Sequence, residues 1–129
     1  MAKYNKYYLY DLVSVVKTMT DENRIRILCA LQKQRLCVCQ LTEMLNLAPS
    51  TVSKHIALLK LARLVESEKE GRWVYYKLSQ KKGSSIATEA LKWLFHFACE
   101  AEEIKKDKRT LNKILEIKPE VLCRLKRVK

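Results

Sequence analysis

Glycine and proline are scarce in this chain of 129 residues, with two of each, and histidine also occurs only twice. Two glycines cannot build the glycine-rich loop with which nucleotide-binding enzymes cradle phosphate. Neither His55 nor His96 has a nucleophile and an orienting carboxylate beside it, as a hydrolytic triad would need. No apolar run approaches the ~18 residues of a membrane span, and the first residues lack the apolar centre of a signal peptide. These absences argue against an enzyme and against a membrane-spanning or secreted protein.

Acidic residues are also few relative to basic ones. Twenty-six lysines and arginines stand against fourteen aspartates and glutamates, which gives a formal net charge of +12. Such an excess favours a polyanionic partner, nucleic acid first and an acidic membrane surface second. The basic C-terminal segment is charged round all its faces and is not the amphipathic helix that a membrane surface binds, so we expect no membrane partner.

The charge is distributed unevenly along the chain. Ten basic and three acidic residues lie from Lys105 onward. We therefore predict a domain over residues 1–104, followed by a basic C-terminal tail over residues 105–129. In that tail we expect at most one weak helix, from Leu111 to Ile117.

Apolar residues recur at helical spacing in five segments of the domain. Between the second and third of these segments, Leu36 to Cys39 is predicted to be short and extended. Two strands, Leu64 to Glu70 and Arg72 to Leu78, are joined at Gly71, which can adopt the positive φ of a tight hairpin. The order is α-α-(β)-α-α-β-β-α, a mainly α fold with a small β-hairpin (α+β). The predicted helices cover residues 7–19, 20–31, 40–45, 50–62 and 86–104.

The helix that follows Pro49 has two different faces. Val52, Ile56 and Leu59 form one apolar stripe, while short hydroxyl side chains gather near its N-terminus. Such a helix can pack its back on a protein core while its front end enters a DNA major groove.

Three motifs occur in an order and at a spacing that resemble the ArsR/SmtB family of small dimeric winged-helix repressors, which sense metals or metalloids. The motifs are Leu36-Cys37-Val38-Cys39-Gln40-Leu41, Val52-Ser53-Lys54-His55-Ile56 and Glu70-Gly71-Arg72-Trp73-Val74-Tyr75-Tyr76. The resemblance covers residues 7 to 104. It implies a winged helix-turn-helix with its first helix at Gln40 to Leu45, its recognition helix at Ser50 to Ala62 and its wing at Glu66 to Leu78. One departure is Arg63, where the family often has glycine.

The resemblance also implies a DNA-binding surface. Ser50, Thr51 and Ser53 would reach phosphates or base edges, Lys54 would add charge, and His55 would donate a hydrogen bond. On the wing, Lys69 and Arg72 would contact the DNA backbone or minor groove. The alternatives to DNA contact are purely structural: Ser50 and Thr51 could only cap their helix, and His55 could pack against the wing.

Helices 7–19 and 86–104 have wide apolar faces that a helix-turn-helix core does not need. They predict a homodimer that binds double-stranded DNA at an inverted-repeat operator.

The five cysteines are an odd number without the spacing of a disulfide framework, and we expect them to be reduced in the cytoplasm. Cys37 and Cys39 lie where the arsenic-responsive branch of the family carries its thiolates, so the resemblance implies trivalent arsenic or antimony as inducer. A bound ion would favour extended backbone there and oppose the start of the helix. Members with a complete site carry a third cysteine where this chain has Thr42. The third ligand is then an exogenous thiol or another cysteine, the candidates being Cys29, Cys99 and Cys123.

Other readings of the same residues stay open. Cys37 and Cys39 could be two small, partly buried residues, or they could sense oxidants by pairing with Cys29 or with each other. Another metal could bind the last long helix, where His96, Cys99, Glu100 and Glu103 have ligand spacing. A regulator without a sensing function is the remaining alternative.

Overall fold

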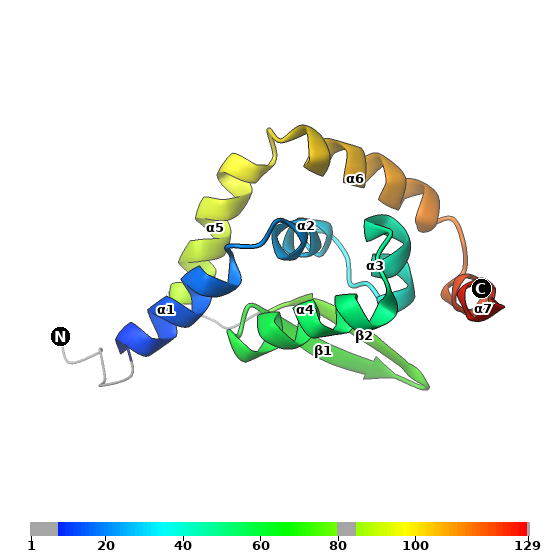
Figure 1. Ribbon diagram of the computed structural model, residues 1–129, viewed down its shortest axis with the longest axis horizontal. Helices are drawn as coiled ribbons and strands as arrows, with labels where there is room; N and C mark the ends of the chain where they lie inside the picture. The colour runs from blue at the N-terminus through cyan, green and yellow to red at the C-terminus, as the bar shows by residue number, and fades with distance from the viewer. Residues whose placement is uncertain (1–7, 80–84, 129) are drawn as a thin grey trace.

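The computed structural model describes residues 8–79 and 85–128. The described part is mainly helical with one antiparallel hairpin, as predicted (Figure 1). The elements are α1 (Tyr8–Thr18), α2 (Glu22–Ala30), α3 (Val38–Leu45), α4 (Pro49–Leu61), β1 (Val65–Glu70), β2 (Trp73–Leu78), α5 (Ile86–Ala98), α6 (Glu102–Ile114) and α7 (Pro119–Val128).

Helices α2, α3 and α4 form the centre of the molecule, and each is bounded by a recognisable signal at one end. The Asp21 carboxylate caps α2 by accepting a hydrogen bond from the Arg24 backbone N–H at 3.1 Å. Asn46 ends α3 in the left-handed conformation, with φ 55°, and Pro49 opens α4. The core between the helices buries Ile27, Leu28, Leu36, Leu41, Val52, Ile56 and Leu59, among others.

The two strands form the predicted hairpin, with Val65 paired to Leu78 and Glu70 paired to Trp73. Gly71 has φ 62°, which confirms the positive φ expected at the turn. Arg63, between α4 and β1, also has a positive φ of 63°. The turn at which the family often has glycine is therefore made here by arginine in the left-handed region, where a residue with a Cβ is less relaxed than glycine.

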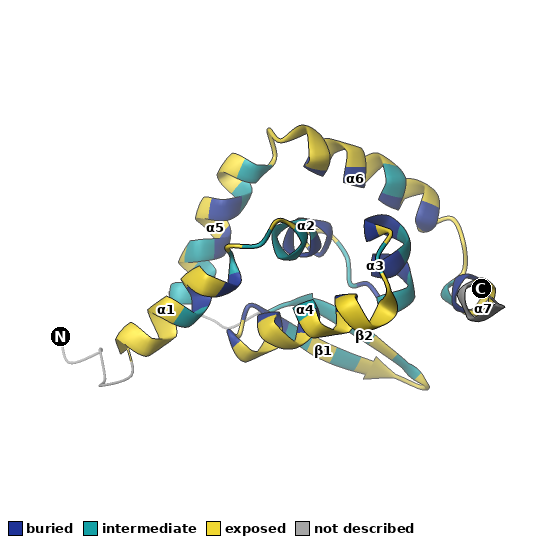
Figure 2. Cartoon of the chain, in the orientation of Figure 1, coloured by how far each residue is buried: buried dark blue, intermediate teal, exposed yellow. Residues whose placement is uncertain are grey.

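The prediction of one long helix over residues 86–104 is wrong. Helix α5 ends at Ala98, the chain turns, and α6 begins at Glu102. Ile104, Leu111 and Ile114 are buried, and α6 packs against α2 and α3 (Figures 1 and 2). A straight continuation of α5 could not bring this apolar stripe onto α2. The stripe therefore requires the change of direction.

The segment expected to be a tail is helical and packed in the described part. The helix expected from Leu111 to Ile117 is replaced by the end of α6 and the turn before α7. Helix α7 packs against α3 and buries Leu122 and Cys123. Charge dominated the sequence pattern here, but the apolar residues are spaced so that each helix has one buried face. The division into a domain over residues 1–104 and a separate segment over 105–129 stays a prediction.

An ion pair also fixes α6 to α2. The Arg26 guanidinium donates two hydrogen bonds of 2.8 Å to the two carboxylate oxygens of Asp107. The Asp107 side chain is only 9% exposed, so the pair is largely withdrawn from water. This bidentate contact raises the pKa of Arg26, although burial opposes the shift.

Candidate DNA-binding face and thiol site

The outer face of α4 carries the side chains predicted to contact DNA. Ser50, Thr51, Ser53 and Lys54 are all exposed, while Val52 on the opposite face is completely buried. The N-cap of α4 is Ala48, and no side chain caps this helix. The alternative that Ser50 and Thr51 serve as its caps is therefore wrong, and their hydroxyls face solvent.

Two leucines on α4 were not among the predicted contacts. Leu58 and Leu61 are 45% and 75% exposed on this helix. An exposed apolar side chain on a recognition helix can contact the methyl group of thymine. The sequence does not single them out, because both fit the helical apolar pattern of a buried stripe.

His55 lies apart from the exposed row. It is half-buried, and its Nδ1 is 3.3 Å from the Arg24 guanidinium of α2. Arg24 also donates to the backbone carbonyl of Thr18 at 2.6 Å. Burial raises the pKa of nearby Asp21, but the Arg24 backbone hydrogen bond and the charges of His55 and Arg24 outweigh it and leave that pKa lowered. His55 therefore joins α4 to the junction of α1 and α2.

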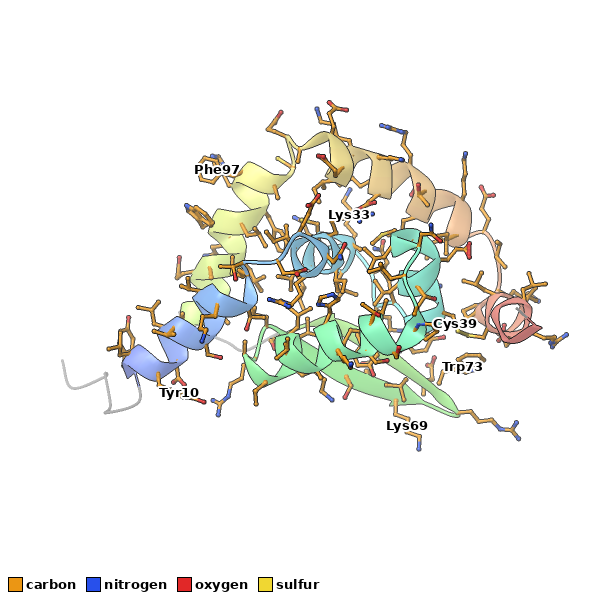
Figure 3. All side chains as sticks on the ribbon, viewed as in Figure 1. Tyr10, Lys33, Cys39, Lys69, Trp73 and Phe97 are labelled. Carbon is orange, nitrogen blue, oxygen red and sulfur yellow. A yellow bond between two sulfur atoms is a disulfide. The ribbon has the colours of Figure 1, made fainter. Side chains whose placement is uncertain are left out.

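The two predicted wing residues are at or near the tip of the hairpin. Lys69 and Arg72 are exposed, and Lys69 points away from the body of the protein (Figure 3). Trp73 and Tyr76 are half-buried.

Arg35 holds the wing against the loop before α3. Its guanidinium donates to Glu68 at 2.6 Å and to Glu70 at 2.5 Å. These two hydrogen bonds raise the pKa of Arg35. The guanidinium also lies 4.1 Å from the ring centre of Tyr75. One face of the Tyr75 ring is thereby covered by Arg35.

Cys37 and Cys39 occupy the first turn of α3. Cys37 is the N-cap residue, buried and with extended backbone (φ −92°, ψ 168°). The Gln40 side chain accepts a hydrogen bond from the Cys37 backbone N–H at 3.0 Å, which is one half of a capping box. Cys39 is already inside the helix. The two residues therefore span the boundary between extended and helical backbone, and α3 begins two residues before the predicted start at Gln40.

The expectation that no cysteine forms a disulfide is wrong for one pair. Cys39 is bonded to Cys123 of α7, across a sequence separation of 84 residues. The sequence could not show this pairing because it depends on α6 carrying α7 back to α3. In this state Cys39 has no thiolate to offer a metal.

Apart from Cys123, the residues considered as further ligands do not lie together around Cys37 and Cys39. The Thr42 side chain, at the position of the family's third cysteine, is fully buried and donates to the Cys39 carbonyl at 2.9 Å. Cys29 is buried, which raises its pKa to about 11 and disfavours the thiolate. His96 and Cys99 are exposed on or just after α5. Over residues 8–79 and 85–128, no group of three or more His, Cys, Asp or Glu is arranged to hold a metal ion.

A large apolar surface remains between α1 and α5. A groove of about 1270 Å³ is lined by residues of both helices, and Trp93 and Phe97 are 63% and 60% exposed. Tyr10 and Phe97 point outward from these helices (Figure 3). This is the surface that the sequence predicted as the dimer interface.

The part of the chain that matches a known protein family begins and ends within the elements described above. Residues 21–67, from the cap of α2 to β1, match the family described as "Bacterial regulatory protein, arsR family". The chain is 34% identical over 80 residues to the arsenical resistance operon repressor of Bacillus subtilis, covering 61% of this chain and 76% of that one. The chain belongs to the ArsR family. Other curated relatives of this ArsR-family protein are matched over 51% to 60% of their length.

Solved structures agree with the fold. Reduced HlyU of Vibrio cholerae is similar to this ArsR-family chain with a TM-score of 0.60 and 33% identity, over 71% of this chain and 93% of that one. A homodimeric winged helix-turn-helix domain of Mycobacterium bovis has a TM-score of 0.62 at 24% identity, over 78% and 92% of the two chains. This likeness shows that the two chains share the fold.

The family and the fold are those of DNA-binding transcriptional regulators, which are not enzymes. The winged helix-turn-helix implies that this member binds DNA. None of its described helices is long and apolar enough to cross a membrane.

Proposed function

We propose that this ArsR-family protein is a homodimeric cytoplasmic repressor that binds an inverted-repeat operator and releases it when Cys37 and Cys39 bind trivalent arsenic or antimony. The observation that carries the proposal is the position of this cysteine pair in the first turn of α3, the helix that packs directly against the recognition helix α4. The similarity to the arsenical resistance operon repressor of Bacillus subtilis supports the choice of inducer.

The DNA-reading part of the proposal assigns roles by position. Ser50, Thr51 and Ser53 face solvent at the N-terminal half of α4, where the helix dipole favours phosphate. Lys54 adds charge on the same helix. Lys69 and Arg72 extend the contact along the DNA from the wing. His55 supports the helix through Arg24, and its direct contact with DNA stays a prediction.

The thiol part rests on the chemistry of the ligands. Sulfur ligands suit a soft, thiophilic ion far better than a hard one, and trivalent arsenic and antimony are of the soft kind. Cys37 precedes the helix and Cys39 lies within it. Bringing both sulfurs to one side therefore requires extended backbone across the first turn.

The first turn of α3 is connected to both DNA-binding elements. Helix α3 packs against α4, and Leu36, next to Cys37, is hydrogen-bonded to Tyr76 of the wing. A distortion at Cys37 would thus displace the recognition helix and the wing together. Release of DNA needs a coupling free energy of only about 1–3 kcal/mol between the two sites.

The test is a fluorescence-anisotropy titration on an inverted-repeat duplex from the protein's own promoter, under reducing conditions. We expect arsenite to release the wild type and a Cys99→Ser control, and to leave a Cys37→Ser/Cys39→Ser variant bound. Tight DNA binding that arsenite does not change in the wild type would reject the inducer and retain the repressor.

The disulfide favours a second candidate, a repressor that senses thiol oxidation. Oxidation would bond Cys39 to Cys123 and so fasten α7 to the helix-turn-helix. This candidate predicts different operator affinities for the oxidised and reduced wild type. It predicts no such difference for Cys123→Ser, which cannot form the bond.

A further inference from the structure

Cys123 and Cys39 are neighbours because of the fold, not only because of the bond between them. Helix α7 packs on α3, and both Leu122 and Cys123 are buried, at 3% and 6% exposed. The Cα atoms of the two cysteines are 5.4 Å apart. Burial of the apolar face of α7 holds it against α3, so reduction of the disulfide would leave two thiols facing each other.

A site built on Cys37 and Cys39 lacks a third sulfur within α3. Thr42 is the residue at the corresponding position, and its hydroxyl is buried and already donates to the Cys39 carbonyl. An alcohol oxygen is also a hard, neutral ligand and a poor replacement for a thiolate. Cys29 is disfavoured as a thiolate by its burial, which raises its pKa. Of the remaining cysteines, Cys99 is exposed beyond α5 and Cys123 lies at Cys39.

We infer that Cys123 supplies the third thiolate of the metalloid site, which is thus formed by Cys37, Cys39 and Cys123. The inference rests on the proposed function and names the ligand that α3 lacks. The site opens when a thiol reductant delivers two electrons and two protons to the Cys39–Cys123 disulfide. Arsenous acid, As(OH)₃, then condenses with three thiols: three As–S bonds replace three As–O bonds, and three water molecules leave.

The arrangement assigns different tasks to the three cysteines. Cys39 and Cys123 already meet, so they form the fixed part of the site. Cys37 is the mobile part, because it is the N-cap residue of α3, whereas Cys39 lies two residues further on, inside the helix. Turning Cys37 toward the pair breaks the hydrogen bond between its N–H and Gln40 and opens the first turn of α3. Helix α7 thereby serves as the anchor against which α3 is unwound.

The experiment measures which cysteines arsenite protects from alkylation in the reduced full-length chain, by peptide mass spectrometry. In the wild type we expect protection of Cys37, Cys39 and Cys123, with Cys29 and Cys99 unchanged. The affinity of Cys123→Ser for arsenite should fall more than about tenfold, since residues that only orient a metal ligand already cost that much. Cys99→Ser is the matched control and should bind as the wild type does.

A second probe separates two thiolates from three. Phenylarsine oxide carries one As–C bond and can bind only two sulfurs, so Cys123→Ser should retain it through Cys37 and Cys39 while losing most of its arsenite affinity.

The inference is overturned if Cys123 stays reactive in the presence of arsenite, or if Cys123→Ser binds arsenite as tightly as the wild type. Absence of any arsenite binding rejects both it and the proposed function. Protection of the three cysteines without release of DNA keeps the inference and rejects the proposed function. Release of DNA with Cys123 unprotected does the reverse.

Discussion

Leu36 and Tyr76 exchange two backbone hydrogen bonds, of 3.0 Å from the Leu36 N–H and 2.8 Å from the Tyr76 N–H. This short bridge joins the residue before Cys37 to the second strand of the wing. Arg35, one residue earlier, adds its contacts with Glu68 and Glu70. These contacts hold the loop before α3 and the wing together, so a displacement of one should displace the other.

Arg35→Ala should weaken operator binding without unfolding the protein. The side chain is partly exposed, so its loss removes a restraint on the wing and not a part of the core. We expect higher operator Kd values together with faster hydrogen exchange at the amides of β1 and β2. Arg109→Ala, which removes the same charge from the exposed side of α6, is the control. Equal losses of affinity in both variants would attribute the effect to charge alone.

Lys54→Ala should weaken binding to all DNA sequences alike, because a phosphate contact carries no sequence information. The plot of log K against log salt concentration should become shallower by about one unit. The measurement is anisotropy on operator and random duplexes at several salt concentrations, with exposed Lys113→Ala on α6 as control. An unchanged salt slope for Lys54→Ala would remove Lys54 from the interface.

Asp107→Ala should destabilise the fold by about 3 kcal/mol, because it leaves the Arg26 guanidinium partly buried without its partner. Chemical denaturation of the reduced protein measures the free energy of unfolding. Glu103→Ala, an exposed position on the same helix, should change it by less than about 0.5 kcal/mol. Similar values for the two variants would show that α6 is not fixed by this pair.

Cys29 should resist alkylation at neutral pH in the folded, reduced protein. Burial raises its pKa from 9.0 to about 11, so the unreactive thiol persists well above the pH at which an ordinary cysteine ionises. Because the unfolded chain loses this proton first, stability should decline as pH rises from about 9 towards 11. Iodoacetamide labelling across this range, with exposed Cys99 as internal reference, measures the effect. Rapid labelling of Cys29 at pH 7 would contradict it.

Phe97→Asp should convert a dimer into a monomer at micromolar concentration. The substitution places a charge in the apolar groove between α1 and α5, where pairing of two copies would bury it. Sedimentation velocity measures the change. Leu115→Asp, at an exposed apolar position after α6, is the control and should remain dimeric.

Much of the fold could be predicted because its signals are local. Asp21 as a cap, Pro49 at a helix start and Gly71 in a hairpin each act within a few residues, and the structure has all three. The disulfide partner of Cys39 depends on the path of two helices and had no local signal. The same holds for His55, whose spacing fits a DNA contact but whose ring meets Arg24 of another helix.

The C-terminal region shows the opposite failure. Its many charges suggested a solvated tail, yet Leu111, Ile114 and Leu122 are buried. A few apolar residues at helical spacing outweigh many charges when the charged side chains can all remain in water.

The conformation of Arg63 has a consequence for how the DNA-binding elements move. With φ at 63°, a residue that has a Cβ sits in a narrow energy well, whereas glycine would roam over a broad one. Arginine therefore gives up some intrinsic backbone energy and gains a stiff joint between α4 and β1. If α3 rotates the recognition helix as proposed, such a stiff joint would pass the rotation on to the wing.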